Sequence, residues 1–499
     1  MCPLNAWCPV PVAEYGSDGM VHFLVTRRPV SIPFGSSTPY PSIGHAAVGM
    51  MFTPFRSTVM TLPIHHAHAA GIDLGSAWIF VSVDGVAVER FPTFTADLQR
   101  AVAHLQKHGC TTVAMEATGV YWVSFYEMLE RAGIDVCLCN GAHAKNLPGR
   151  KSDVQDCQWL QRMHTHGLLR PSFVPPETLR LLRTYTRLRD DHIEQAAMHT
   201  LRMQKALEQM NIKIHHVLSQ LHGESGIRMV RAMVAGERDA ERLLALCDRR
   251  IITQKAEAMR KALEGVYRSD HLFVLRQALE SWDFYQGQIR ACEGEMRQLL
   301  TTITDDLPPS STPSAPHPTR HHQPDIDDLH EKVMRLCSGE NPAAIPGISD
   351  VLALKILAET GVDYSHWKTA KHFTSWMHLA PRQEQSGSKT RKARAQGMNR
   401  AGQLFRQAAQ SLANSKYTAM GAFYRRIKAK HGPRVAMKAV ARKVAVQFYN
   451  VMVHGVAYVE AGVESYQQTY EETVKRHMVR QAKRFGMELV AVGSVAPTC

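Results

Sequence analysis

The sequence predicts an α/β domain, a long coiled-coil helical arm and a mostly α-helical C-terminal domain, in that order. In the first domain, strand-like apolar runs such as GIDLGSAWIFVSVDG alternate with amphipathic helical segments, which is typical of layered α/β folds. The arm is predicted by the run from Glu177 to His222, which lacks Pro and Gly and repeats apolar residues mostly every three or four positions. We expect one continuous helix over residues 176–222, whose apolar stripe packs against another helix and pairs subunits. Helical periodicity resumes from about residue 331.

The change of pattern along the 499 residues predicts six parts. Residues 308–324 contain six prolines, which indicates a linker. The stretch before Ala70 contains Pro, Gly and Ser clusters without sustained periodicity, and it holds several methionines that could each be the true start. The predicted parts are a poorly ordered extension (1–66), the α/β domain (67–175), the helical arm (176–302), a Pro-rich linker (303–330), the C-terminal domain (331–460) and a charged helical tail (461–499).

The elements of the first domain follow from local patterns. The run GIDLGSAWIFVSVDG predicts two strands with a turn at Gly75, and VAVERF predicts a short third strand. Helices are predicted over residues 95–107 and 119–132, and CTTVAME and IDVCLCN predict two more strands. Cys137 and Cys139 would lie on the same side of the last strand, and we interpret them as buried thiols rather than zinc ligands.

The charge distribution indicates a polyanionic partner. The formal net charge is +14, and residues 331–499 alone carry 26 Lys and Arg against 11 Asp and Glu. Between Gln385 and Val459 there are 15 Lys and Arg and no carboxylate. A solvated surface normally mixes both signs, so a stretch of one sign favours nucleic acid as the partner over a basic helical face that serves solubility.

The remaining bulk properties indicate a cytoplasmic protein without a membrane span. No run of about 20 uncharged apolar residues occurs, and no basic segment followed by an apolar run opens the chain. The ten cysteines are scattered without CxxC spacing, which is typical of reduced thiols. We therefore expect a cytoplasmic location.

Four carboxylates are candidates for metal binding. Asp73 lies within the first strand, and Glu116 ends a later strand just before a Gly-led helix. Ser152 predicts a helix start that places Asp153 and Asp156 on one face of the first turn. Taken singly, each acid could cap a turn or a helix. Together, hard oxygen ligands from two strand ends and one helix suit two Mg²⁺ ions and phosphodiester chemistry, which is the RNase H-like arrangement.

A polar loop after an apolar helix ending at Leu379 contains the second chemical candidate. Ser386 lies in the sequence QSGSK, and its hydroxyl could attack a phosphodiester or merely contact a phosphate. Ser388 is the rival within the same loop. Gly347, in the turn IPGIS before an apolar helix, suggests a helix-hairpin-helix-like grip on a phosphate backbone, although a simple turn between helices explains it too. The cations that we expect to contact nucleic acid are Lys389, Arg391, Lys392, Arg394 and Arg400.

These motifs resemble the DEDD transposases of the insertion-sequence-one-ten type. The matching stretches are GIDLGS, AMEATGVYW, KSDVQDCQWL and GLLRPSFVP in the first half, and IPGISDVLALKILAETG, FTSWMHLAPRQEQSGSK and GMNRAGQLFRQAAQSLA in the second. They span about residues 70–300 and 340–460.

The resemblance implies a RuvC-like catalytic domain and a bridge-RNA-guided recombinase that cuts and rejoins DNA. It implies that Asp73, Glu116, Asp153 and Asp156 bind Mg²⁺ and that Ser386 is the nucleophile. It also implies a structured guide RNA, DNA of the element ends and target, and homodimers that assemble into a tetramer.

Two other functions are compatible with the same residues. A hydrolytic RuvC-like junction nuclease would use the four acids with water as the nucleophile and would not need Ser386. A non-catalytic nucleic-acid-binding protein would keep the acids for structure and would be indifferent to divalent metal.

Overall fold

The structure is a computed structural model that describes most of the chain after the N-terminal extension. The chain divides between Ile64 and His65, and every helix and strand below belongs to the part that begins at His65. Residues 1–61 of the predicted extension and residues 311–321 of the predicted linker lie outside the described residues. The described residues are 62–141, 152–310, 322–381, 383–392, 398–415 and 418–489.

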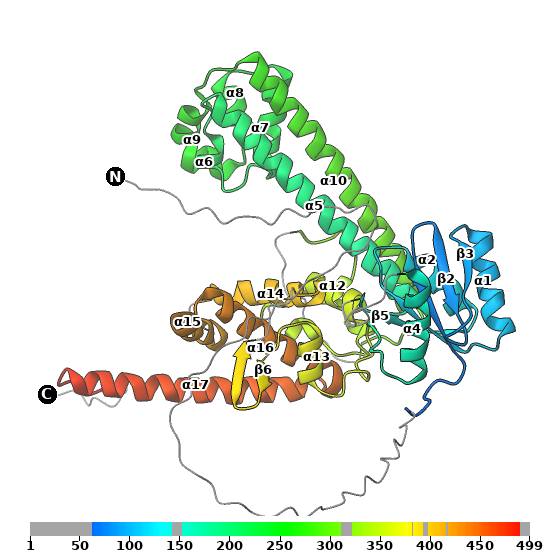
Figure 1. Cartoon of the computed structure of the whole chain (residues 1–499). Helices are drawn as coiled ribbons and strands as arrows, with labels where there is room; N and C mark the ends of the chain where they lie inside the picture. Colours follow the sequence, from blue (N-terminus) through cyan, green and yellow to red (C-terminus); the bar gives the residue numbers. More distant parts are fainter. Residues whose placement is uncertain are drawn as a thin grey trace, which may run out of the picture. The chain divides into compact units, whose positions relative to one another are not determined.

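A mixed five-stranded sheet forms the centre of the first domain (Figure 1). Its order is β3-β2-β1-β4-β5, so the first strand is central. β1 pairs antiparallel with β2 and parallel with β4, and β5 continues the parallel half. The strands are β1 (Ala69–Leu74), β2 (Trp78–Ser82), β3 (Glu89–Pro92), β4 (Thr112–Glu116) and β5 (Asp135–Cys139).

Helices cover both faces of this sheet, which confirms the predicted layered α/β fold. α1 (Thr95–Lys107) and α2 (Trp122–Arg131) share a buried core with Ile72 of β1, whereas α4 (Asp153–Thr165) packs on β1 from the other side. α1 has the predicted bounds. α2 begins three residues later than predicted, because Gly119 has a φ of +54°, which a right-handed helix does not contain.

Two long antiparallel helices form the arm. α5 (Glu177–Gln209) and α10 (Ser269–Thr304) run side by side (Figure 1). Between them, the buried guanidinium of Arg189 donates to Glu293 over 2.8 Å and to the carbonyl of His322 over 2.8 Å. Most of the apolar stripe of α5 is buried within the chain, so the stripe does not itself require a second subunit.

The expected single helix over residues 176–222 is wrong. α5 ends at Gln209, and the chain turns at Asn211, whose φ of 57° is in the left-handed region that Asn tolerates. The turn lets the following apolar residues join a separate small core with α5 and α10. Four helices surround this core and are called the cap of the arm below. They are α6 (Ile214–Val217), α7 (Glu224–Ala235), α8 (Ala240–Ala245) and α9 (Arg249–Leu263).

The C-terminal part is mostly helical, as predicted. Fully buried Phe373, Phe405 and Phe448 stand at the centre of its core. Residues 383–392, expected to be a polar loop, instead form a hairpin of β6 (Gln383–Ser386) and β7 (Lys389–Lys392). The helices are α11 (Leu329–Leu336), the 3-10 turn η1 (Pro342–Ala344), α12 (Asp350–Thr360), α13 (Ala370–Trp376), α14 (Arg400–Ala413), α15 (Ala419–His431), α16 (Pro433–His454) and α17 (Val456–Arg484).

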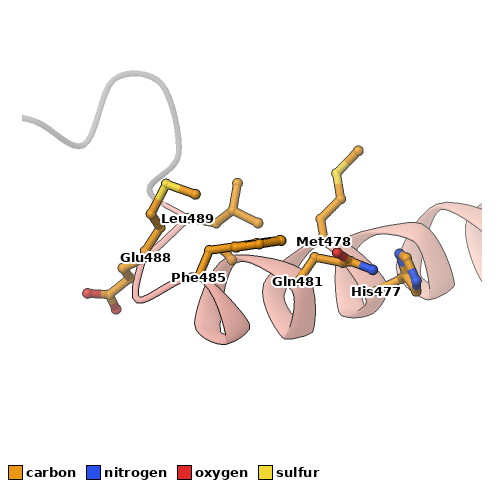
Figure 2. Close-up of a pocket in the computed structure, with 8 residues that line it drawn as sticks. His477, Met478, Gln481, Phe485, Glu488 and Leu489 are labelled. Atoms are coloured by element: carbon orange, nitrogen blue, oxygen red, sulfur yellow. The ribbon is translucent and has the colours of Figure 1, made fainter.

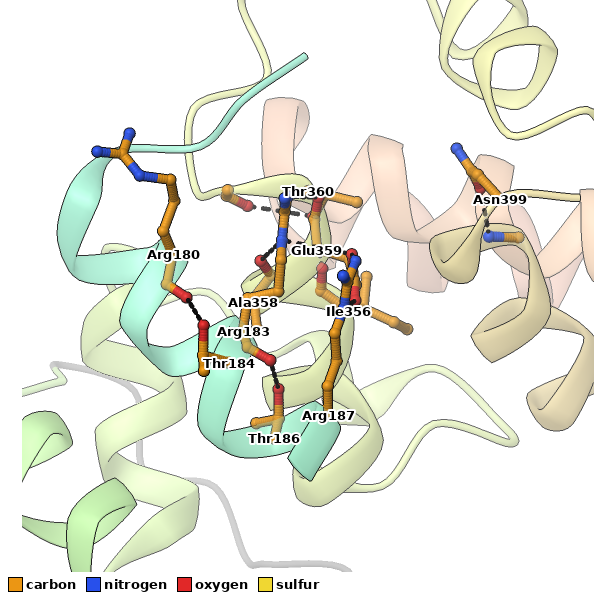
Figure 3. Close-up of polar contacts among 12 residues, drawn as sticks. Arg180, Arg183, Thr184, Thr186, Arg187, Ile356, Ala358, Glu359, Thr360 and Asn399 are labelled. Carbon is orange, nitrogen blue, oxygen red and sulfur yellow. Dashed lines mark hydrogen bonds and ion pairs between the residues drawn. The ribbon is translucent and has the colours of Figure 1, made fainter. Parts of the chain in front are cut away.

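Arginines of α5 connect the arm to the end of α12 (Figure 3). Arg183 donates to the carbonyl oxygens of Ala358 (3.1 Å) and Glu359 (2.9 Å). Arg187 donates to both carboxylate oxygens of Glu359, each over 2.7 Å. Burial lowers the pKa of Arg183 to about 10, and Glu359 partly offsets that effect. These contacts satisfy carbonyl groups at a helix C-terminus with cationic donors.

None of the described helices combines the length and the apolar character that a membrane span needs.

Candidate functional site

Asp73 points from the central strand of the sheet toward α4. It lies between buried Ile72 and Leu74 on β1, and its neighbour Gly71 lies on the same face two positions earlier. That face carries α4, since the backbone of α4 approaches Gly71. Asp73 is therefore a half-buried carboxylate between the sheet and a helix.

Glu116 reaches the same edge of the sheet from the neighbouring strand. β1 and β4 run parallel with Ile72 opposite Met115, so Glu116 stands level with Asp73. The Thr118 hydroxyl donates to Glu116 Oε1 over 3.2 Å. A Cβ on Gly141 would lie 2.7 Å from the carboxyl carbon of Glu116, so a side chain at position 141 would displace this carboxylate.

The other two acids open α4. The Ser152 side chain accepts a hydrogen bond from the Gln155 amide over 3.4 Å, which confirms the predicted N-cap. Asp153 and Asp156 then occupy the first turn. A Cβ on Gly71 would overlap the carbonyl oxygen of Cys157, so α4 lies directly on β1 just after this turn. The close approach brings the first turn of α4 beside the end of β1.

Electrostatic coupling links the four carboxylates. The pKa of Asp73 is raised from 3.8 to about 6, first by burial and then by the charges of Asp153, Asp156 and Glu116. Burial and like charges within interaction range both disfavour the ionised form of a carboxyl group. Burial also raises the pKa of the adjacent Cys157 thiol to about 12, with Asp73 contributing, so this thiol is not a nucleophile at neutral pH.

The carboxylates are nevertheless not drawn into a tight cluster. Within the described residues, no three of the four bring their oxygen atoms within 4.8 Å of one another. Mutual repulsion favours this wider spacing. The donor set fits Mg²⁺ chemically, because all four side chains offer hard oxygen ligands.

Ser386 is the last residue of β6 and pairs with Lys389 across the hairpin. The two-residue turn is Gly387-Ser388, with Gly387 at a φ of +58°, and Ser388 is exposed. The Gln385 side-chain amide donates to the Gly387 carbonyl over 3.2 Å. The hairpin thus carries both candidate serines at or next to its turn.

The cations predicted to contact nucleic acid differ from one another in their surroundings. Lys389, Arg391 and Lys392 all belong to β7, beside the serine turn. Arg394 lies outside the described residues. Arg400 begins α14, and its guanidinium lies 3.7 Å from a carboxylate oxygen of Asp190, which also pairs with Lys355. Part of the charge of Arg400 is therefore balanced within the chain.

Gly347 has a packing role of its own. Its φ is +88°, and a Cβ there would lie 2.9 Å from the Ala408 carbonyl oxygen and 2.9 Å from Leu412 Cγ on α14. The turn then leads into α12, where the Ser349 hydroxyl accepts from the Leu352 amide over 3.3 Å. A close helix contact is sufficient to require glycine at this position.

The sequence patterns did not single out Gly71, which lets α4 approach β1, Gly141 beside the Glu116 carboxylate, or a cationic cluster on α15 and α16. Arg426 and Lys443 lie 5.5 and 4.7 Å from the centroid of the Phe423 ring, and Lys428 lies 6.0 Å from that of Tyr424. Burial, followed by the charge of Arg426, lowers the pKa of Lys443. The carboxylate-free stretch was the available signal for this cluster.

A hollow at the end of α17 differs from the carboxylate site in the residues that line it (Figure 2). Most of its lining is apolar, and its single acid is Glu488. The lining residues are His477, Met478, Gln481, Ala482, Phe485, Met487, Glu488 and Leu489.

Comparisons with protein families give two matches. Residues 70–212 match the model of the DEDD domain of IS110 elements, described as a transposase. Residues 342–425 match the model described as the transposase IS116/IS110/IS902 family. The first match covers the sheet, the four carboxylates and α5, and the second covers the segment from η1 into α15, including both candidate serines. No individual curated protein matches the chain.

Proposed function

Because the chain belongs to the IS110-type transposases, we propose that it moves an insertion sequence by a metal-dependent reaction with a serine nucleophile. Transposases of this kind cut and rejoin DNA. The observation that carries the metal site is the position of the four carboxylates at one edge of the sheet, on β1, on β4 and on the first turn of α4. The pKa of Asp73, raised first by burial and then by the other three charges, agrees with this position. The proposed Mg²⁺ ligands are Asp73, Glu116, Asp153 and Asp156.

We further propose that the first domain is RuvC-like, within the RNase H-like folds. Two features support this assignment. The first strand is central in a mixed five-stranded sheet, and the acids come from that strand, its parallel neighbour and a helix packed on it. The Mg²⁺ ions would supply Lewis-acid stabilisation of charge at the scissile phosphate. In the free chain the carboxylates keep a site of high negative charge that attracts such cations.

The proposed serine step conserves the energy of the phosphodiester bond. The Ser386 hydroxyl oxygen attacks phosphorus and loses its proton, and the bond from phosphorus to the leaving ester oxygen breaks. The leaving strand takes up a proton and ends in a free hydroxyl. A hydroxyl of the new partner strand then attacks the phosphoserine and regenerates the serine. Lys389, directly across from Ser386, would attract the phosphate.

A structured guide RNA and assembly through dimers into a tetramer also belong to the proposal. The cationic cluster on α15 and α16 supports a polyanionic partner, because several cations gather there around aromatic rings. For assembly, exposed Leu181 and Leu188 lie seven residues apart on one face of α5.

The hydrolytic nuclease is the second candidate, since the same carboxylates would serve it. It differs in one respect that can be measured. Hydrolysis leaves no covalent link between protein and DNA, whereas serine attack does. A protein that binds nucleic acid without catalysis would show neither cleavage nor dependence on Mg²⁺.

The test is to trap labelled DNA of the element ends on the full-length protein with Mg²⁺ and RNA transcribed from the flanking non-coding DNA. We expect a covalent adduct with wild type and with Ser388→Ala, and none with Ser386→Ala. Asp73→Asn should bind DNA but form no adduct. An adduct that persists in Ser386→Ala would refute the assigned nucleophile. Cleavage without any adduct in wild type would favour the hydrolytic nuclease.

A further inference from the structure

A second cluster of potential metal ligands lies at the tip of the arm, on elements that carry none of the four acids. Glu208 is the penultimate residue of α5, and His215 and His216 belong to α6, which lies among the cap helices beyond the end of α5 (Figure 1). One ligand atom from each lies within 4.8 Å of the others. Within the described residues, this is the one group of three or more His, Cys, Asp or Glu side chains that is so tightly spaced.

The contact geometry converges on one carboxylate oxygen. The Nε2 atoms of His215 and His216 each lie 2.8 Å from Glu208 Oε1. Ligand atoms around a tetrahedral zinc ion at about 2.0–2.2 Å from the metal are roughly 3.3–3.6 Å apart, so a lengthening of about 0.5–0.8 Å per contact would admit the ion. Such a shift is within the reach of side-chain rotation.

The backbone around the cluster is held by contacts independent of these three side chains. The Lys213 amide donates to the Ala262 carbonyl over 2.7 Å, and the Val266 amide donates to the Met210 carbonyl over 2.8 Å. Ile212 and Ile214 are fully buried in the core of the cap. The ligands are thus presented by a fixed turn, and a preorganised set of this kind loses little conformational entropy on binding.

The cluster is also open to an ion from solvent. The side chains of Glu208 and His216 are 36% and 62% exposed, whereas His215 is mostly covered at 15%. Three protein ligands with an exposed side leave a position for water. The Lys213 ammonium also pairs with Glu208, through Oε2, and is the cation that a metal would compete with.

We propose that Glu208, His215 and His216 bind one borderline transition-metal ion, with Zn²⁺ as the representative. Two imidazoles and one carboxylate suit Zn²⁺ and its neighbours, whereas Mg²⁺ prefers a full set of oxygen ligands. The site is therefore chemically distinct from the four acids of the α/β domain. Its effect would be to fasten α6 to the end of α5 at the turn where the arm meets its cap.

The experiment measures Zn²⁺ binding to full-length protein in the Asp73→Asn background, with excess Mg²⁺, against a chromogenic chelator. We expect Glu208→Gln and His216→Gln each to lose one zinc ion per chain, or to weaken Zn²⁺ binding at that site by at least about 100-fold. Losing a side chain that only orients a metal ligand costs about 10- to 100-fold in affinity, and losing a ligand itself should cost more. His271→Gln, at a histidine of α10 outside the cluster, is the matched control and should keep the ion.

Lys213→Met distinguishes a metal site from a cluster in which Glu208 only forms ion pairs and hydrogen bonds with Lys213 and the two histidines. Removing the competing ammonium should retain or tighten Zn²⁺ binding if Glu208 is a ligand. Hydrogen exchange of residues 208–217 should slow on adding Zn²⁺ to the Asp73→Asn protein and to His271→Gln, but not to His216→Gln. Equal zinc stoichiometry in the background protein, Glu208→Gln and His216→Gln, together with unchanged exchange, would overturn the proposal.

Discussion

Gly71 on β1 lies so close to Cys157 on α4 that any side chain at position 71 would overlap the Cys157 carbonyl oxygen. The same missing Cβ would lie 2.9 Å from Gln161 Cα. The two obstacles are backbone atoms, so no rotamer change can relieve the overlap. Because Asp73 follows two residues later on the same face, this contact determines how near the first turn of α4 comes to the proposed metal site.

Replacing Gly71 by Ala should therefore separate α4 from the sheet. We expect a loss of about 3 kcal/mol in the free energy of unfolding, at the upper end of overpacking effects, together with a loss of Mg²⁺-dependent cleavage. Denaturant unfolding and a cleavage assay measure the two effects. Gly287→Ala on α10 is the control, because a Cβ there meets no atom within 4 Å and alanine favours a helix. Equal stability of the two variants would contradict the close contact.

The raised pKa of Asp73 predicts a pH-dependent stability. The folded protein holds this proton up to about pH 6, while the unfolded chain releases it near 3.8. The free energy of unfolding should therefore fall as the pH rises from about 4 to about 6 and then stay lower. The fall should be about 1–2 kcal/mol, because solvent screens the charge of a carboxyl group that is only half-buried.

Asp73→Asn should remove this dependence. In a chelator-containing buffer at pH 7.5 the variant should be more stable than wild type, and near pH 4 the difference should disappear. Asp84→Asn is the control, because backbone hydrogen bonds from Val86 and Ala87 lower the pKa of Asp84 and make its charge favourable. An Asp73→Asn protein that is less stable than wild type at pH 7.5 would refute the electrostatic coupling.

Ser152 is expected to matter through the acids that it positions. Ser152→Ala removes the N-cap of α4, which should cost about 1 kcal/mol and let the first turn fray. The Mg²⁺ concentration needed for half-maximal cleavage should rise. Thr418→Ala removes the equivalent cap of α15, where the threonine hydroxyl accepts from the Gly421 amide, and should leave the Mg²⁺ requirement unchanged. A similar Mg²⁺ shift in both variants would show that general stability is the cause.

The α/β domain was predictable because its local signals agree with its fold. The strands 112–116 and 135–139 are apolar runs next to helices of clear periodicity, and Ser152 has the residue type of an N-cap. The same signals put the four acids at strand ends and a helix start. Their joint position could be inferred because the carboxyl ends of parallel strands meet at one edge of a sheet.

The arm and the hairpin were not predictable in the same way. Met210, Ile214 and Leu221 keep helical spacing although the chain turns at Asn211, so periodicity alone cannot separate one long helix from a helix followed by a turn and a second core. The hairpin 383–392 consists almost wholly of polar residues, so no alternation marks its strands. The ligands of the cluster at the tip of the arm are brought together by that same unpredicted turn.

The pair of Arg187 and Glu359 should couple the arm to α12. Glu359 is 8% exposed and accepts two hydrogen bonds from Arg187, while Arg183 Nε lies 3.4 Å from one of its oxygens. A double-mutant cycle of Arg187→Ala and Glu359→Gln should give a coupling energy of about 1 kcal/mol, since the pair is bidentate but Arg187 is 43% exposed.

The control cycle uses Arg131 and Glu177, whose side chains are 66% and 55% exposed. Its coupling energy should be at most about 0.5 kcal/mol. Arg187→Lys should lose most of the coupling, because an ammonium cannot make the two parallel bonds. Strict additivity of the Arg187 and Glu359 substitutions would mean that the contact does not hold the arm to α12.

The proposed subunit pairing through the arm should depend on the face of α5 that the chain leaves exposed. Leu181 and Leu188 are 45% and 44% exposed on one face, and Phe273 and Phe284 of α10 form another such face at 61% and 59%. Leu188→Glu should leave the monomer stable to within about 0.5 kcal/mol, because the residue packs on little, yet shift the mass in solution from dimer toward monomer. Light scattering at micromolar concentration, with guide RNA present, measures the mass. Phe284→Glu is the parallel variant on α10. If this substitution alone dissociates the dimer, the interface lies on α10 instead of α5. If the wild-type protein is monomeric, pairing through the arm is excluded.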